Sequence, residues 1–134
     1  MLAFIIAAIV SLQADFVQTK HSAMFSEPQV STGKMIYRAP SYLLWAYEQP
    51  GNIVWEIDGE QSNVNPHVQR LLRMIMASIA SEGKTDTTLD RESKKLFQSV
   101  TVRMDEHTNI AQQVELIEKK GDTTIIEFNN VIAK

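Results

Sequence analysis

The chain has 134 residues, of which 44% are hydrophobic and 22% are charged, and its net charge is −3. This size and composition are typical of a single globular domain over residues 1–134, with its own core and no room for a second domain. The acidic balance and the lack of a basic stripe argue against nucleic-acid binding, which requires clustered lysine and arginine. The sequence has no cysteine, which excludes disulfides, thiolate nucleophiles and cysteine metal sites.

The first ten residues, MLAFIIAAIV, are apolar throughout, and the next ten are mainly polar. An apolar run of this length is too short to cross a bilayer, which takes about twenty residues. It resembles the apolar part of a signal peptide, although no basic residues precede it. Apolar residues also repeat here at helical spacing: Ile5, Ile9, Leu12 and Phe16. We therefore predict a helix from about Ala7 to Lys20, joined to the remnant of an export signal at residues 1–10.

Two short segments alternate between apolar and polar residues, at 34–38 and 42–48. The break Ala39-Pro40-Ser41 separates them, and Pro40 belongs in a turn because proline has no amide hydrogen for a strand ladder. The pattern predicts a β-hairpin. Its inner face carries large apolar side chains, which are Met35, Tyr37, Leu43, Trp45 and Tyr47. This surface requires a partner layer, either a core or a bound apolar ligand.

Residues 52–57 alternate again, with Ile53, Trp55 and Ile57 on one face, and Asp58-Gly59 is a turn signal. A short polar strand is predicted across residues 60–64. A helix then begins with Asn65 as N-cap and Pro66 at the first helical position, and Gly83 is its stop signal. Its apolar stripe comprises Val68, Leu71, Leu72, Ile75, Met76 and Ile79.

Residues 84–95 are polar and predict a loop, after which three segments alternate at 100–104, 113–116 and 123–128. Regular spacing of this kind predicts an antiparallel meander in which each strand neighbours the next. The predicted fold class is therefore α+β and mostly β, a curved antiparallel sheet with two helices that cover one face.

No constellation of residues indicates catalysis. The three histidines, His21, His67 and His107, fall in three different elements, and no two have the spacing of metal ligands on one helix. Neither a nucleophile elbow nor a glycine-rich phosphate loop is present. We therefore predict no enzyme, no catalytic residue, no metal and no cofactor.

Two features have both an ordinary and a functional interpretation. The methionine-rich segment LLRMIMASIA is typical of a core helix, but methionine also recurs on surfaces that re-pack around varied apolar ligands. Trp45 and Trp55 each lie on the apolar face of a strand, where tryptophans are more often core residues than ligand contacts, so the pair alone does not decide between a core and a ligand-binding wall.

The order of these segments resembles the periplasmic outer-membrane lipoprotein carrier family LolA, with its receptor relative LolB. The resemblance begins at Phe16-x-Gln18-x-Lys20 and covers most of residues 14–81 and 96–132. It includes further short motifs: Ser31, Gly33, the turn from Tyr37 to Pro40, Trp45, Gln49-Pro50, Asp58-Gly59, the helix at 71–79 and the strands around 96–104 and 114–128. Each motif is degenerate, and their order and spacing carry the resemblance.

The resemblance implies an incomplete β-barrel with lid helices across its open face and acyl chains held between them. It assigns the sheet side of that cavity to Met35, Tyr37, Leu43, Trp45, Trp55 and Ile57. The helix side is assigned to Leu12, Phe16, Leu72, Ile75, Met76 and Ile79. The implied function is that of a soluble, monomeric periplasmic carrier that delivers acylated lipoproteins to the outer membrane. The implied partners are an inner-membrane releasing complex and an outer-membrane receptor.

Three departures from the family pattern affect this expectation. Family members often have an arginine immediately before the turn proline that holds the lid closed, whereas this chain has Ala39, and Arg38 is expected to face the other way. Further strands usually follow the lid helix, where this chain has the polar residues 84–95, and members typically continue beyond the position of Lys134. The lack of a lipobox cysteine favours the soluble carrier over the lipid-anchored receptor.

Three alternatives remain on the sequence alone. The first is a binding module on the same scaffold that holds a lipid or polypeptide without handing it on. The second is a small hydrolase that uses a buried carboxylate of raised pKa facing the cavity. The third is a structural domain with a fully packed interior.

Overall fold

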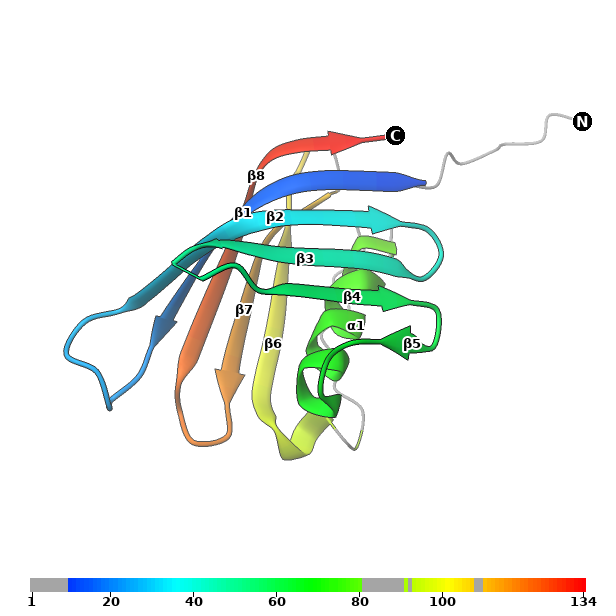
Figure 1. Ribbon diagram of the computed structural model, residues 1–134. Coiled ribbons are helices and arrows are strands. Elements are labelled where there is room, and N and C mark those ends of the chain that lie inside the picture. The colour runs from blue at the N-terminus through cyan, green and yellow to red at the C-terminus, as the bar shows by residue number, and fades with distance from the viewer. Residues whose placement is uncertain (1–9, 81–90, 92, 108–109) are drawn as a thin grey trace, which may run out of the picture.

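The computed structural model describes residues 10–80, 91, 93–107 and 110–134. This part of the chain forms one antiparallel sheet of eight strands, with an α-helix lying across its inner face (Figure 1). The elements are β1 (Ser11–His21), β2 (Gln29–Arg38), β3 (Tyr42–Gln49), β4 (Val54–Asp58), β5 (Gln61–Ser62), α1 (Pro66–Ala80), the 3₁₀ turn η1 (Ser93–Lys95), β6 (Phe97–Met104), β7 (Ala111–Glu118) and β8 (Thr123–Ala133). The α+β, mostly β fold class is thereby confirmed.

The sheet has the strand order β5-β4-β3-β2-β1-β8-β7-β6. The predicted sequence of neighbouring strands is correct within β2 to β5 and within β6 to β8, and β1, which was not predicted as a strand, precedes β2 in the same way. Between these two runs, however, the first strand pairs with the last, from Leu12 opposite Ala133 to His21 opposite Thr123. The short β5 and the longer β6 form two separate edges, so the sheet curves without closing into a barrel, as the incomplete barrel requires.

The predicted N-terminal helix is wrong over the described residues, because Ser11–His21 is strand β1. Leu12 and Phe16 are four residues apart, which suits one helix face, but the same face of a strand also contains Ala14. All three are buried, and the intervening residues are not. Pairing with β2 on one side and β8 on the other outweighs the local helical spacing. The part of the predicted helix before residue 10 lies outside the described residues.

The helix α1 begins as the sequence predicts. The side-chain Oδ1 of Asn65 accepts a hydrogen bond from the backbone N–H of Val68 at 3.0 Å, and Pro66 occupies the first helical position. Leu72, Ile75 and Met76 form its buried stripe. The stop signal at Gly83 lies outside the described residues.

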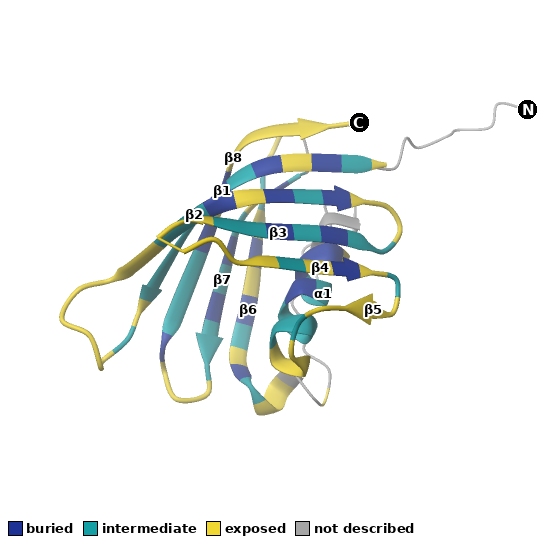
Figure 2. Ribbon diagram, in the orientation of Figure 1, coloured by how far each residue is buried: buried dark blue, intermediate teal, exposed yellow. Residues whose placement is uncertain are grey.

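The core lies between α1 and the inner face of the sheet. Figure 2 shows buried and more exposed residues alternating along β2, β3 and β6, as a sheet with one covered face requires. The predicted facing is confirmed for Met35, Tyr37, Leu43, Trp45 and Ile57, which are at most 2% exposed. Ile53 differs, because it precedes β4 and is 52% exposed.

Gly33 lies opposite Phe16 in the sheet and leaves room for the Phe16 ring. It pairs with Phe16, and a Cβ at this position would lie 2.7 Å from the Phe16 ring and 2.0 Å from the Ala46 carbonyl oxygen. Both distances are below any van der Waals contact, and one of the atoms belongs to the backbone. The glycine therefore allows the Phe16 ring and β3 to approach β2 closely.

Replacing Gly33 by alanine is expected to reduce the free energy of unfolding by about 1–3 kcal/mol, the usual cost of overpacking. Urea denaturation followed by circular dichroism measures this change. Gly51→Ala is the matched control, because a Cβ there meets nothing within 4 Å, and its midpoint should stay close to that of the parent protein. Equal midpoints for the two variants would contradict the close approach at Gly33.

Candidate functional site

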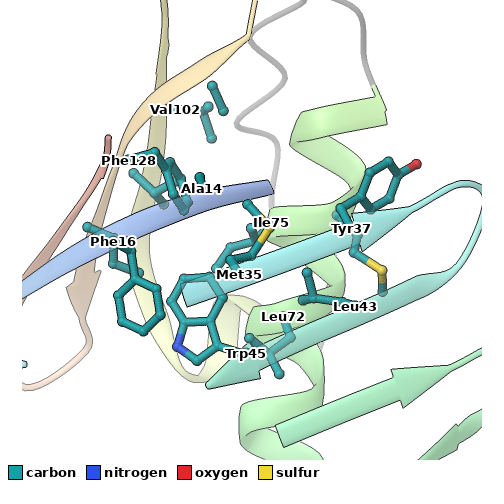
Figure 3. Close-up of a cluster of buried hydrophobic side chains, with 14 of the residues drawn as sticks. Ala14, Phe16, Met35, Tyr37, Leu43, Trp45, Leu72, Ile75, Val102 and Phe128 are labelled. Atoms are coloured by element: carbon teal, nitrogen blue, oxygen red, sulfur yellow. The ribbon is translucent and has the colours of Figure 1, made fainter. Parts of the chain in front are cut away.

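Aromatic rings dominate the inner face of the sheet. The Phe16 and Trp45 rings are stacked with centroids 4.2 Å apart, and the Tyr47 ring meets Phe16 edge-on at 5.3 Å. Trp55 meets Tyr47 edge-on at 5.1 Å, and Phe128 meets Trp45 edge-on at 6.2 Å. Such offset and edge-on pairs each add about 0.5–1.5 kcal/mol beyond area burial. These contacts join the five rings into one continuous aromatic wall. Figure 3 shows Phe16, Trp45 and Phe128 among the buried side chains around them.

The structure brings nearly all of the predicted cavity residues into this wall and the helix facing it. Ten of them are buried in one cluster: Leu12, Phe16, Met35, Tyr37, Leu43, Trp45, Ile57, Leu72, Ile75 and Met76. Trp55 is partly buried and packs against that cluster. The Ile79 side chain lies outside the described residues. One assignment is wrong: Leu12 and Phe16 belong to β1 and therefore to the sheet side, because the segment that carries them is a strand.

Several members of the cluster were not among the predicted site residues. They are Ala14, Phe97, Val100, Val102, Ala111, Val114, Leu116, Ile126 and Phe128. The alternation of Val100, Val102, Val114 and Leu116 does identify one face of β6 and β7. It does not show that the pairing of β1 with β8 joins this face to the aromatic wall. That pairing connects residues over 100 positions apart, so no local pattern predicts it.

The helix α1 is also tied to the sheet by an arginine. The Arg73 guanidinium donates a hydrogen bond of 2.9 Å to the backbone carbonyl of Gly59, in the turn between β4 and β5. Arg38, by contrast, lies over the Tyr42 ring at 5.4 Å and is exposed, which agrees with its expected position on the other face. The arginine contact between helix and sheet in this chain is therefore supplied from the helix.

A polar margin borders the aromatic wall on the sheet. The Tyr47 hydroxyl donates a hydrogen bond to Gln18 Oε1 at 2.8 Å. Burial raises the pKa of the Tyr47 phenol, although the nearby Trp45 and Gln18 side chains oppose that rise. The buried Trp45 indole N–H acts on the Tyr47 phenol as a donor that lowers its pKa, but it makes no hydrogen bond of ordinary geometry. A buried donor that is only weakly satisfied is a candidate contact for a ligand oxygen.

A small pocket adjoins the core beside the start of β7 and the second half of β8. It has a volume of about 180 Å³ and is lined by Asp105, Ile110, Ala111, Gln112, Phe128 and Val131. Ala111 and Phe128 belong to the buried cluster, so this pocket reaches from the surface to the core.

The described residues contain no group of three or more His, Cys, Asp or Glu side chains that could hold a metal ion. Within the same ranges, none of the helices has the length and apolar character needed to cross a membrane.

Comparison with known families identifies the scaffold. The sequence model for "Outer membrane lipoprotein carrier protein LolA" matches residues 7–82, which is more than half of the chain. The chain belongs to the LolA family. The match contains β1 to β5 and α1, so the helix and every ring of the aromatic wall except Phe128 lie within the LolA region.

Two further comparisons add little to the LolA assignment. A solved structure of a DUF1329 family protein from Desulfovibrio piger is similar with a TM-score of 0.38 and 8% identity, over 94% of this chain and 86% of that one. No curated protein matches the chain.

Proposed function

We propose that this LolA family member is a carrier that holds acyl chains of lipoproteins between the inner face of its sheet and α1. The observation that carries the proposal is the composition of the two facing surfaces. Phe16, Met35 and Trp45 cover the sheet side, and Leu72, Ile75 and Met76 cover the helix side. No charged side chain is among the buried members of this cluster.

The energetics allow α1 to exchange places with an acyl chain. A buried Leu, Ile or Met side chain contributes about 1.5–3 kcal/mol, and a buried CH₂ group contributes about 0.8 kcal/mol. A chain with about ten buried methylene groups would therefore match what the three helix side chains lose when α1 moves off the sheet. The flexible methionines at 35 and 76 suit such re-packing, because methionine adapts to irregular apolar surfaces.

The polar margin supports an ester-linked ligand. The Trp45 indole N–H has no hydrogen bond of ordinary geometry and acts only weakly on the Tyr47 phenol, which donates its own hydrogen bond to Gln18. An acyl ester carries carbonyl oxygens that accept hydrogen bonds, so the end of the ligand that bears the ester would lie beside Trp45. This arrangement satisfies a donor that is otherwise buried at a cost.

On this proposal the protein is not an enzyme and works in the periplasm as a monomer. It receives acylated lipoproteins from a releasing complex at the inner membrane and passes them to a receptor at the outer membrane. The role of the twelve predicted cavity residues is then to form a wall that is closed when empty and lined with acyl chain when loaded.

Dense packing favours one other candidate, a structural domain without a ligand. Leu43 and Ile57 have no exposed surface, and Trp45 is 1% exposed. A carrier and a packed domain share this appearance when empty, because both must hide apolar surface from water. They differ in whether α1 gives way to an acyl chain.

The hydrogen bond from Arg73 provides a test of that difference. Arg73→Met keeps most of the aliphatic stem but removes the bond to the Gly59 carbonyl, which should cost about 1–2 kcal/mol of unfolding free energy. In a carrier the variant should also load a fluorescent triacylated lipopeptide several-fold faster, as measured by stopped-flow fluorescence. Arg103→Met removes the same charge and an exposed hydrogen bond to Gln113 from β6. Because both groups there are exposed to water and lie away from α1, this control should change stability little and loading not at all. Unchanged loading by a destabilised Arg73→Met variant would contradict a helix that moves.

A further inference from the structure

We propose that the end of the sheet formed by the β1–β2 hairpin and the β7–β8 turn docks on the surface of an anionic lipid bilayer. The hairpin extends beyond the neighbouring strands, as Figure 1 shows, and its tip is exposed in Figure 2. Large apolar side chains gather at this tip. Met24 is 82% exposed, Phe25 is 49% exposed, and Val30 at the start of β2 is 55% exposed.

The tip is shaped by its own hydrogen bonds. The backbone N–H of Phe25 donates to the Ser22 carbonyl at 3.2 Å, and the backbone N–H of Met24 donates to the Ser22 hydroxyl at 3.2 Å. Backbone N–H groups that lack a partner oppose entry into a less polar medium. Here the N–H groups of Met24 and Phe25, the two most outlying of the three apolar residues, already have partners, which suits the tip to the interface between headgroups and acyl chains.

A rim of lysines lies beside the hairpin at the same end of the sheet. His21 pairs with Thr123, which places the β7–β8 turn beside the hairpin, and the Lys119 N–H donates to the Leu96 carbonyl at 3.0 Å, which brings η1 to the same end. Lysines outnumber carboxylates over the β1–β2 hairpin, the β7–β8 turn and η1. The lysines are Lys20, Lys94, Lys95, Lys119 and Lys120, and the carboxylates are Glu27, Glu118 and Asp122.

Two of the three carboxylates at this end, Asp122 and Glu118, lie close to lysines. Asp122 lies 3.5 Å from the Lys120 ammonium and 3.9 Å from that of Lys20, and Glu118 lies 3.7 Å from Lys20. Burial opposes ionisation of Asp122, but a hydrogen bond from Ser22 and the charges of Lys120 and Lys20 outweigh it and lower its pKa. The rim therefore keeps a positive excess, although the whole chain carries −3.

Acidic residues are in excess at the opposite end of the sheet. Asp58 ends β4, Glu60 follows it, and Asp105 and Glu106 follow β6, whereas Arg38 ends β2 and Lys134 follows β8. An anionic surface would therefore attract the hairpin end more than this end, which orients the protein.

This combination of apolar tip and lysine rim fits a membrane surface better than a protein groove. Lysine stems are long enough to reach headgroup phosphates while the tip enters the acyl boundary. Insertion of the apolar tip alone gives weak binding, and so does attraction of the lysines to anionic headgroups alone. The two contributions add, so together they give reversible membrane binding. The inference concerns the outer end of the hairpin and does not rely on the acyl-binding proposal.

Co-sedimentation of the full chain with vesicles tests the inference. We expect binding to vesicles of phosphatidylcholine with phosphatidylglycerol, and at least tenfold weaker binding to phosphatidylcholine alone. Met24→Ser/Phe25→Ser should weaken binding to the anionic vesicles at least tenfold, and Lys119→Gln/Lys120→Gln should weaken it and reduce its salt dependence. Val131→Ser/Ile132→Ser, at the other end of β8, removes exposed apolar side chains of similar size and should bind as the parent protein does.

A site-specific probe supplies a second readout, because the chain has no cysteine of its own. Phe25→Cys labelled with an environment-sensitive nitrobenzoxadiazole dye should shift its emission to the blue on anionic vesicles, and Ile132→Cys with the same label should not. Equal binding of the parent and the Met24→Ser/Phe25→Ser variant would overturn the inference. A blue shift at Ile132, or binding only to a protein partner and to no vesicle, would overturn it as well.

Discussion

Trp45→Glu is expected to leave the protein unfolded at neutral pH. Trp45 is 1% exposed and is stacked on Phe16 with ring centroids 4.2 Å apart. Truncation of a buried tryptophan costs about 3–5 kcal/mol, and a buried carboxylate without a partner adds several more. A domain of this size has a total stability of about 5–15 kcal/mol, so the combined cost removes most or all of it. Near-ultraviolet circular dichroism and urea denaturation measure the loss.

Val54→Glu is the control for this substitution. Val54 is an apolar residue of the adjacent strand β4, but it is 50% exposed, so a carboxylate there keeps its water. Its denaturation midpoint should stay close to that of the parent protein. If Trp45→Glu folds normally and only loses ligand binding, Trp45 faces an open, water-accessible cavity and the packed wall described here is wrong.

Met76→Glu is expected to lower affinity for an acylated ligand at least tenfold, which corresponds to about 1.4 kcal/mol. Met76 is 6% exposed and lies on the stripe of α1 that faces the sheet. A carboxylate at this position would either be desolvated by contact with the acyl chain or keep α1 at a distance from the acyl chain. Titration of a fluorescent triacylated lipopeptide into each variant measures the affinity.

Ala77→Glu places the same charge one residue further along α1, where the side chain is exposed. It should bind the lipopeptide as tightly as the parent protein. Equal weakening by Met76→Glu and Ala77→Glu would show that charge on the helix, rather than the inner face, determines binding. Normal binding by Met76→Glu would exclude the space between α1 and the sheet as the ligand site.

The sequence predicts those features that depend on neighbouring residues. Alternation places Met35, Trp45 and Ile57 on one face because the period of a strand is fixed by its backbone. Asn65 predicts the start of α1 because the capping side chain accepts a hydrogen bond from the N–H of Val68, only three residues further along the chain. Most residues of the candidate site follow from these two local rules together with the family resemblance.

Features that depend on distant pairing could not be predicted. Leu12 and Phe16 suit a helix and a strand equally, and β2 and β8 decide between them by providing ladders on both sides. The positive rim has the same cause, since Lys20, Lys94 and Lys119 are dispersed along the chain. They meet only because β1 pairs with β8 and the β7–β8 turn contacts the start of β6.

Native mass spectrometry of the full chain purified from a bacterial periplasm, followed by organic extraction, tests whether the protein carries acyl chains. We expect a bound acylated lipid or lipopeptide that extraction releases and that the Met76→Glu variant lacks. A clean apo mass that stays unchanged after incubation with a triacylated lipopeptide would contradict the carrier and leave a packed structural domain.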